Sequence, residues 1–323
     1  MSPFRAIAAS LLLALAACES APTRHVTLSG ADSARPGFEA ISLFGEELPR
    51  PEVPDERRAA LDADLFAARL VLERRPGDPD AHIWVGRRLG YLGRYREAVD
   101  AFTAGLRRFP QSYRLLRHRG HRNITLRRLD AAVDDLSRAA ALSRGATDEI
   151  EPDGAPNRWN IPRSTDQSNI YYHLGLAHYL RGEFGAAELA FTECLDYAAV
   201  NDDMLVATLY WLSASAARAR GPEAGLEQAR RAHPEMHVIE NHAYHRLLLA
   251  RAAGTSEELL AQTEPASLDW LTTAYGVSLS REIAGDHEGA EALREEILAS
   301  SNWAAFGYIA AEADLARAQG TPR

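Results

Sequence analysis

Hydrophobic residues along most of the chain recur at the three- and four-residue spacing of an amphipathic helix. In the first such segment Leu61, Leu65 and Ala68 fall on one helical face, and the pair Pro76-Gly77 ends it. The same spacing continues, with interruptions, almost to the C-terminus. The pattern predicts an all-α region over residues 55–323.

Within this region the pattern repeats with a period of about 34 residues. The first unit has its small, aromatic and proline positions at Gly86, Gly93, Tyr95, Ala98, Phe102, Leu106 and Pro110. The second unit has matching positions at Gly120, Leu129, Ala132, Leu136 and Ala139, and the third at Tyr171, Leu174, Gly175, Ala177, Gly182, Phe184, Ala187, Phe191 and Leu195. Small residues let two antiparallel helices approach closely, and the larger ones fill the space beside them. This pattern resembles that of the tetratricopeptide repeat family. The resemblance implies a right-handed superhelix of antiparallel helix pairs, an α-solenoid.

Later helix pairs are less regular. We expect them at residues 205–220 with 222–232, 240–253 with 257–262, and 269–284 with 286–299. A last helix, capped by Asn302 and carrying Trp303, Phe306, Ile309 and Leu315 on one side, is expected to cap the open end of the solenoid.

One segment, residues 142–168, departs from the repeat. It contains the turn-forming run 151–157, so a long helix is not expected there. Trp159 and Ile161 predict that part of this inserted loop packs back on the helices. Insertions in repeat proteins often lie on the binding side, so the loop is a candidate cover for a binding groove.

The N-terminal residues carry a different signal. Arg5 precedes a short apolar run that ends in Leu15-Ala16-Ala17-Cys18, which resembles the lipobox of bacterial lipoproteins. The resemblance implies a signal peptide at residues 1–17 and lipid attachment at Cys18. Glu19 is not the aspartate that retains such proteins in the inner membrane, so the outer membrane, facing the periplasm, is expected. Residues 18–54, which contain Pro36, Pro49, Pro51 and Pro54 among their five prolines, are expected to form a flexible tether.

In tetratricopeptide arrays the first helix of each pair lines the concave groove. Carried onto this sequence, that pattern gives the candidate groove residues Trp84, Arg87, Arg114, Arg117, His118, His121, Tyr172 and His173. All 36 basic residues are arginine, whose planar guanidinium suits carboxylates. Although the net charge of −9 argues against nucleic acid, this groove would suit an acidic peptide or a C-terminal carboxylate. A solvated arginine face without a ligand is the alternative.

The histidines suggest a second hypothesis. His118 and His121 are three residues apart, as are His242 and His245, so each pair projects from one helix face. If the two pairs met in space, with His173, Asp153 and Asp202 nearby, they could hold Zn²⁺. A lone histidine at a helix contact is more often structural, and no zinc-binding motif is present in the sequence.

No known catalytic motif and no cofactor-binding loop is present, and the sequence does not indicate an enzyme or a cofactor. Cys194 falls at a small core position and is expected to be a buried, inert thiol. Asp202-Asp203 is read most simply as the N-terminal cap of a helix. The sequence therefore favours a membrane-anchored scaffold that binds a protein or peptide partner in the bacterial envelope. The alternative is a protein, or an enzyme, that binds a small ligand or metal in a His/Arg-rich groove under the inserted loop.

Overall fold

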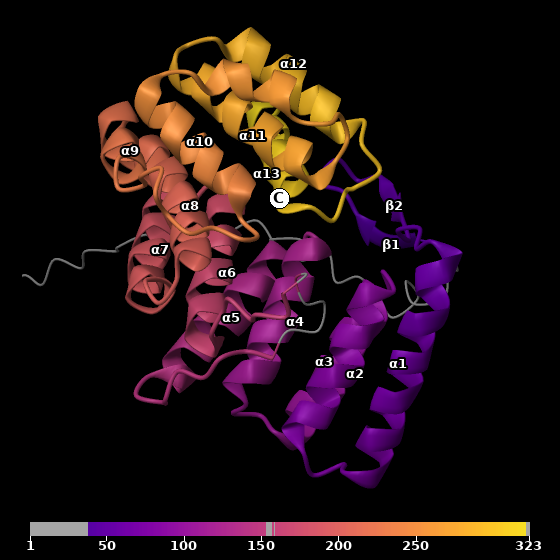
Figure 1. Ribbon diagram of the computed structural model, residues 1–323. Coiled ribbons are helices and arrows are strands. Elements are labelled where there is room, and N and C mark those ends of the chain that lie inside the picture. Colours follow the sequence, from indigo (N-terminus) through magenta and orange to yellow (C-terminus); the bar gives the residue numbers. More distant parts are fainter. Residues whose placement is uncertain (1–37, 153–156, 158, 321–323) are drawn as a thin grey trace, which may run out of the picture. The chain divides into compact units, whose positions relative to one another are not determined.

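Helices follow one another in antiparallel pairs through the computed structural model, which describes residues 38–152, 157 and 159–320 (Figure 1). The first nine are α1 (Asp55–Arg74), α2 (Pro79–Tyr91), α3 (Tyr95–Arg108), α4 (Tyr113–Thr125), α5 (Leu129–Ser143), α6 (Asp166–Leu180), α7 (Phe184–Ala198), α8 (Asp202–Arg220) and α9 (Pro222–Ala229). The others are α10 (His242–Ala253), the 3₁₀ helix η2 (Ser256–Gln262), α11 (Leu268–Ile283), α12 (His287–Leu298) and α13 (Phe306–Ala318). The predicted fold class, an all-α solenoid of tetratricopeptide-like helix pairs, is confirmed.

The three predicted repeat units are the pairs α2–α3, α4–α5 and α6–α7. Each holds its two helices together by the same contact of a glycine with a large side chain. A methyl group on Gly120 would lie 2.6 Å from Leu136, and one on Gly175 would lie 2.8 Å from the Phe191 ring. Gly86 faces Phe102 in the same way. The absence of a side chain on these glycines is therefore what permits the close approach.

The helices form two layers. The first helices of successive pairs, α2, α4, α6 and α8, contact one another, and each also packs on its own second helix. This inner layer is where the predicted groove residues lie. Among the described residues, no helix is long and apolar enough to cross a membrane.

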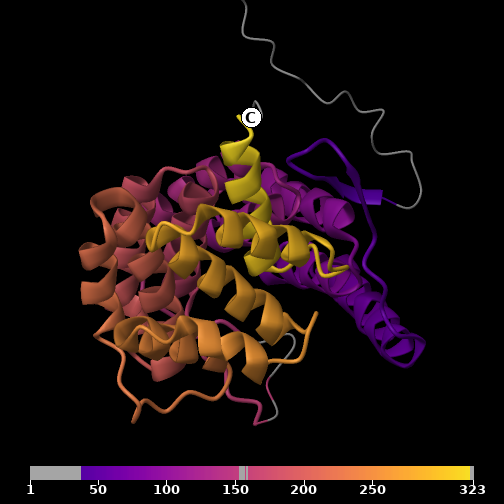
Figure 2. The same cartoon turned by 90° about the horizontal axis from the view of Figure 1, so that it is seen from above.

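The terminal helix α13 packs on the last pair, α11 and α12, and also reaches α6 (Figure 2). It begins at Phe306 after the N-cap residue Ala305, not at Asn302 as expected. All residues from Gly307 to Ala316 are buried. Because neighbours cover it on more than one side, it is not a helix with one apolar face.

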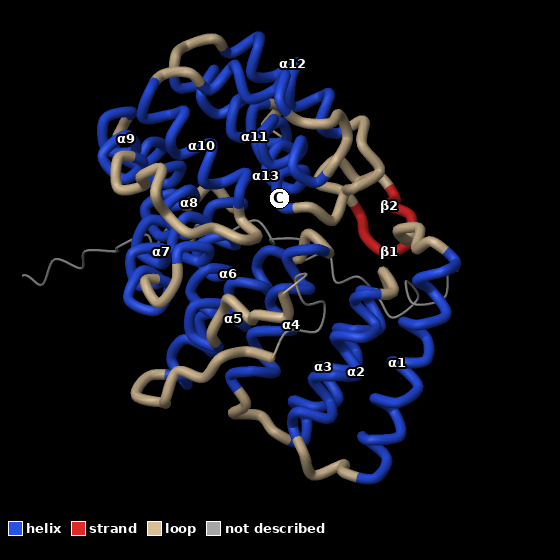
Figure 3. Tube along the Cα trace, in the orientation of Figure 1, coloured by secondary structure: helices blue, strands red, loops and turns tan. Residues whose placement is uncertain are grey.

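Part of the predicted tether is instead a β-hairpin. Strands β1 (Phe38–Ile41) and β2 (Glu47–Pro49) pair antiparallel (Figure 3). Ala40 and Leu48 are buried, which gives the hairpin a small apolar face. The signal peptide 1–17, Cys18 and the tether up to residue 37 lie outside the described residues, and they stay predictions.

The inserted loop joins α5 to α6 over residues 144–165. Backbone hydrogen bonds fix its two ends together, with Asp166 N donating to Glu149 O at 2.8 Å and Glu151 N donating to Ser164 O at 3.0 Å. Glu151 is 6% exposed. Trp159 and Ile161, which we expected to pack inward, are 44% and 45% exposed. The loop is thus anchored by an acidic side chain, because the helices beneath it present arginines.

The start of α8 also differs from the expectation. Asn201 is the N-cap, and its side chain accepts a hydrogen bond from Met204 N at 3.0 Å. Asp203 is fully buried and accepts hydrogen bonds from Glu240 N and Asn241 N, at 2.8 and 3.0 Å. It fixes the connection to α10 rather than capping its own helix.

Candidate functional site

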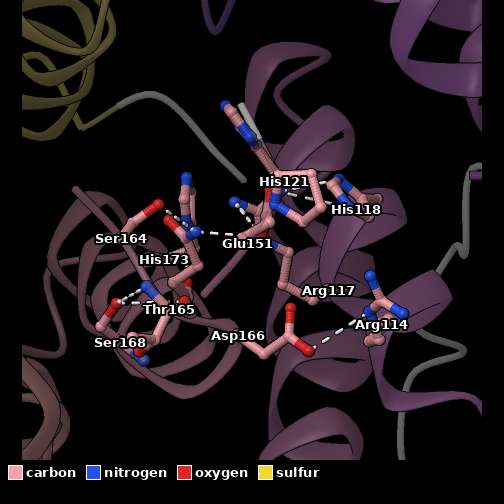
Figure 4. A network of polar contacts seen from close by, with 12 residues as sticks. Arg114, Arg117, His118, His121, Glu151, Ser164, Thr165, Asp166, Ser168 and His173 are labelled. Atoms are coloured by element: carbon pink, nitrogen blue, oxygen red, sulfur yellow. Dashed lines mark hydrogen bonds and ion pairs between the residues drawn. The ribbon is translucent and has the colours of Figure 1, made fainter. Parts of the chain in front are cut away.

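Helices α2 and α4 bring several of the predicted groove residues around one cavity of about 140 Å³. Arg87 comes from α2. Arg117 and His118 come from one turn of α4, and His121 comes from the next turn (Figure 4). Gly86 and Gly90 form part of the wall, where a larger residue would fill the space. We call Arg87, Arg117 and Arg122, which also lines this cavity, the arginine cluster.

The inserted loop supplies a carboxylate to the arginine cluster. Glu151 lies 3.0 Å from Arg117 Nη2 and 3.6 Å from Arg87 Nη1. Asn169 Nδ2 donates to the same carboxylate at 3.0 Å, and Arg87 Nη1 donates to the carbonyl oxygen of Pro152 at 2.6 Å. A carboxylate held by two guanidinium groups and an amide is a strong, charge-assisted arrangement. The groove thus already contains one bound carboxylate, which belongs to the protein itself.

Arg122 has no such partner. Its guanidinium donates to His121 Nε2 and lies over the Tyr95 ring at 5.3 Å, and no described carboxylate forms an ion pair with it. Burial lowers the pKa of Arg122, and nearby Arg117 and Arg87 lower it further. The cavity is therefore lined by three arginines and one carboxylate, and it carries surplus positive charge.

The three histidines of the site are neutral. Burial lowers the pKa of His118, His121 and His173 well below the ordinary value, and the neighbouring arginines add to the effect. Arg117 Nη1 donates to His118 Nδ1 at 2.7 Å, and that nitrogen must be unprotonated to accept it. His118 Nε2 then carries the hydrogen, and it faces Glu151 Oε1 at 3.8 Å. Neutral imidazoles thus act as acceptors for arginine and do not compete with it for the carboxylate.

The deeper part of the predicted groove is filled. The rings of His121 and His173 lie 4.2 Å apart between centroids, and Phe306 at the start of α13 lies 5.5 and 5.8 Å from them. His173 Nδ1 donates to Asn169 O within its own helix at 2.6 Å. A partner peptide therefore cannot run along the inner layer past His121 without displacing α13.

Three other predicted groove residues lie outside the cavity. Arg114 bonds Asp80 at 2.7 Å and lies 3.2 Å from Asp166. Trp84 lies beneath Arg87, whose guanidinium is 4.7 Å from its ring. Tyr172 is buried and packs edge-on against Phe191 in the core.

Asp166, at the start of α6, is the carboxyl group of this region whose protonation is most altered. Its burial raises the pKa to about 6, although Arg114 acts in the opposite direction. Cys194 behaves as expected from the sequence: it is fully buried, and burial raises the pKa of its thiol to about 12. Such a thiol is a poor nucleophile.

The four-histidine metal site is not formed. His118 and His121 face the arginine cluster, whereas His245 Nε2 donates to His233 O at 2.9 Å and His242 is exposed on α10. Helix α10 packs on α8, α9, α11 and η2, so this second pair lies on a different part of the array. No group of three or more His, Cys, Asp or Glu within the described residues could hold a metal ion.

Sequence reasoning missed Glu151, Arg122 and Phe306. The repeat pattern does not cover the inserted loop or the C-terminal segment, so their place in the groove was not readable from it. The acidic run Asp148-Glu149-Ile150-Glu151, opposite an arginine-rich groove, was the one signal in the sequence for Glu151.

No protein-family model matches the chain, and no curated protein matches it. Among solved structures it is similar to the crystal structure of MamA protein, with 16% identity and a TM-score of 0.41, over 65% of this chain and 89% of MamA. It is also similar to yeast Tom70, with 15% identity and a TM-score of 0.37, over 83% of this chain and 61% of Tom70. We take no function from these likenesses, and the assignment of the fold rests on the helix pairs and their glycine contacts.

Proposed function

We propose that this protein is a helical-repeat scaffold that binds a carboxylate-bearing segment of a protein partner at the arginine cluster. The observation that carries the proposal is the bound side chain of Glu151, which shows that the cluster holds a carboxylate. A partner's acidic side chain or C-terminus has the same chemistry, and Arg122 offers a guanidinium with no carboxylate beside it.

The space around Glu151 supports this proposal. A second cavity of about 220 Å³ adjoins the first, and Arg87, Arg117 and Glu151 line both cavities. The Glu151 side chain is thus part of the wall between two small spaces. A ligand carboxylate can therefore reach the arginine cluster in two ways. It can enter beside the Glu151 side chain and bind Arg122, or it can displace the Glu151 carboxylate and bind Arg117 and Arg87.

A fluorescein-labelled acidic hexapeptide with a free C-terminus is the test ligand, with its C-terminal amide and an uncharged hexapeptide as controls. We expect the acidic peptides to bind and Arg122→Gln to weaken binding roughly tenfold or more, because a hydrogen bond to a charged group contributes about 1.5–3 kcal/mol. Arg230→Gln is the matched control, since Arg230 is 56% exposed and pairs only with the exposed Glu223 among the described residues. Equal affinity for the acidic and uncharged peptides would rule out carboxylate recognition.

A second candidate function is a site for a small anion. The observation that favours it is that the inserted loop covers the arginine cluster and leaves only small cavities beside it. Succinate provides the comparison. If succinate binds at the cluster while neither acidic peptide does, the site takes a small dicarboxylate and the protein-partner proposal fails.

We also propose, from the residues Leu15-Ala16-Ala17-Cys18, that the chain is attached to the bacterial envelope by a lipid on Cys18. Two or three acyl chains suffice for stable anchoring. Palmitate labelling of cells that produce the full chain, followed by membrane fractionation, tests this. We expect Cys18→Ser to lose both the label and the membrane fraction, and a label that persists would contradict the proposal.

A further inference from the structure

A larger cavity, of about 410 Å³, lies among α9, α10 and α11 and shares no lining residue with the arginine cluster. Figure 1 shows these helices in the orange part of the chain. Pro222 and Leu226 of α9 and Ile283 at the end of α11, followed by Ala284, give it apolar walls. Its volume lies within the range of about 300–1,000 Å³ that is typical of small-molecule sites.

Arg251, in the last turn of α10, is the unusual residue of this cavity. It lines the cavity, and its Nη2 atom is buried and has no hydrogen-bond partner in the part of the chain that the structure describes. No described carboxylate forms an ion pair with it. Gly225 lets α9 approach α8 closely, since a methyl group there would lie 2.6 Å from Ala217 Cβ, and the same methyl group would lie 3.0 Å from Arg251 Nη2. Arg251 as a whole is only partly buried, but withdrawing part of a cation from water without a counter-charge is costly, so this position favours an anion supplied from outside.

Two further observations agree with an unfilled polar position at this end. Burial lowers the pKa of Arg251, as expected for a cation that lacks a compensating anion. The hydroxyl of Tyr210, which interacts electrostatically with Arg251 but does not line the cavity, is also buried without a hydrogen-bond partner among the described residues. Since buried polar groups are nearly always paired, the unpaired Nη2 atom of Arg251 favours a ligand that supplies a hydrogen-bond acceptor.

The other polar lining residues satisfy one another. Arg281 binds Glu257 through two hydrogen bonds of 2.8 and 2.7 Å, and Ser280 donates to Ser256 at 3.3 Å. Asp286 accepts from Gly289 N at 2.9 Å as the cap of α12. Arg251 is therefore the lining cation that the described residues leave uncompensated.

We propose that this cavity binds an amphipathic monocarboxylate, with its alkyl chain against Leu226 and Ile283 and its carboxylate on Arg251. The combination of apolar lining residues with one cation that lacks a counter-charge matches that class of ligand. It does not match a nucleotide or a sugar, which would need several polar partners. The proposal is independent of the arginine cluster and of the scaffold function.

Octanoate is the probe, titrated into the purified protein by isothermal calorimetry below the concentration at which it forms micelles. We expect one octanoate to bind per chain, Arg251→Gln to weaken binding roughly tenfold or more, and Leu226→Asn to weaken it as well. The matched control is Arg246→Gln, on the same helix, because Arg246 is 36% exposed and its guanidinium pairs with the exposed Asp269. Octanol and acetate test the two halves of the ligand separately, and both should bind much more weakly.

If Arg251 only stabilised the fold, Arg251→Gln would lower the melting temperature. We therefore measure the melting temperature of the same variants with and without octanoate. If Arg251 lacks a counter-charge in the free protein, Arg251→Gln should leave the melting temperature unchanged or raise it, whereas octanoate should raise it only in the wild type. The inference is overturned if octanoate does not bind, if octanol binds equally well, or if Arg251→Gln binds octanoate as the wild type does. Arg117→Gln should leave octanoate binding intact, which separates this site from the arginine cluster.

Discussion

Two arginine side chains donate hydrogen bonds directly to histidine side chains in the core of this protein. Arg117 donates to His118 Nδ1, and Arg122 donates to His121 Nε2. Each imidazole must be neutral to accept such a bond, and each guanidinium beside it disfavours protonation further. The pair is stable only while the histidine carries no charge, so the packing of these residues sets how stability responds to pH.

This arrangement predicts that the free energy of unfolding falls as the pH drops below about 6.5, where histidine in an unfolded chain takes up a proton. His118, His121 and His173 have lowered pKa values in the folded protein, so between their folded values and 6.5 only the unfolded chain binds these protons. The loss is up to about 1.4 kcal/mol per pH unit for each histidine. Urea denaturation between about pH 7.5 and 5 measures it.

Asp166 acts with the opposite sign. Its pKa is raised to about 6, so below that pH the folded protein binds a proton that the unfolded chain does not bind until lower pH. We therefore expect Asp166→Asn to make the fall in stability steeper and His121→Gln to make it shallower. A wild-type protein whose stability is constant over this range would show that the histidines are charged or accessible in the folded state.

The helices were predictable because the contacts that define them are local. In each repeat, a glycine of the first helix faces a large residue sixteen positions later in the second, as in Gly86 with Phe102 and Gly120 with Leu136. The prediction of Arg87, Arg117 and His118 as groove residues came from the family resemblance and not from this glycine spacing. The glycine rule weakens toward the C-terminus, where Gly276 of α11 packs on Leu247 of the preceding helix α10. In the repeat a glycine contacts the helix that follows it, so the contact of Gly276 with the earlier helix α10 could not be predicted from the repeat.

A pair of glycine substitutions tests this rule. Gly175→Ala places a methyl group 2.8 Å from Phe191, and overpacking of this kind costs about 1–3 kcal/mol. Gly185 lies at the exposed start of α7, and a methyl group there would meet nothing within 4 Å, so Gly185→Ala should stabilise by up to about 1 kcal/mol through helix propensity. Thermal and urea unfolding of both variants measure the difference. If both variants were stabilised, the close approach of α6 and α7 would not depend on Gly175.

At the scale of the whole described unit, segments near its two ends meet. Trp303 Nε1 donates to Pro49 O of β2 at 2.9 Å, and Leu43 N donates to Glu312 Oε1 of α13 at 2.5 Å. Arg127, between α4 and α5, holds Glu312 at 2.6 Å and the Trp303 carbonyl oxygen at 2.8 Å. None of these contacts was predictable, since they join residues up to 269 positions apart and lie outside the repeat. A helical array is usually held by contacts between neighbouring helix pairs, and these additional contacts connect the first described segments to the last ones.

This closure predicts an unusually large effect for Arg127→Met. Arg127 and Glu312 have side-chain exposures of 2% and 1%, so the single change leaves a buried carboxylate unpaired and should cost about 3–5 kcal/mol. The double variant Arg127→Met/Glu312→Leu should cost less than the sum of the single variants, since it removes both charges and leaves Leu43 N as the main unpaired group. The exposed pair Arg230–Glu223 is the control, and Arg230→Gln should cost less than about 1 kcal/mol.

Because nearest-neighbour arrays unfold in parts when their ends are free, Arg127→Met should also broaden the urea transition. If Arg127→Met cost no more than the control and left the transition sharp, the helix pairs alone would hold the array, and the contact between the two ends would be incidental to its stability.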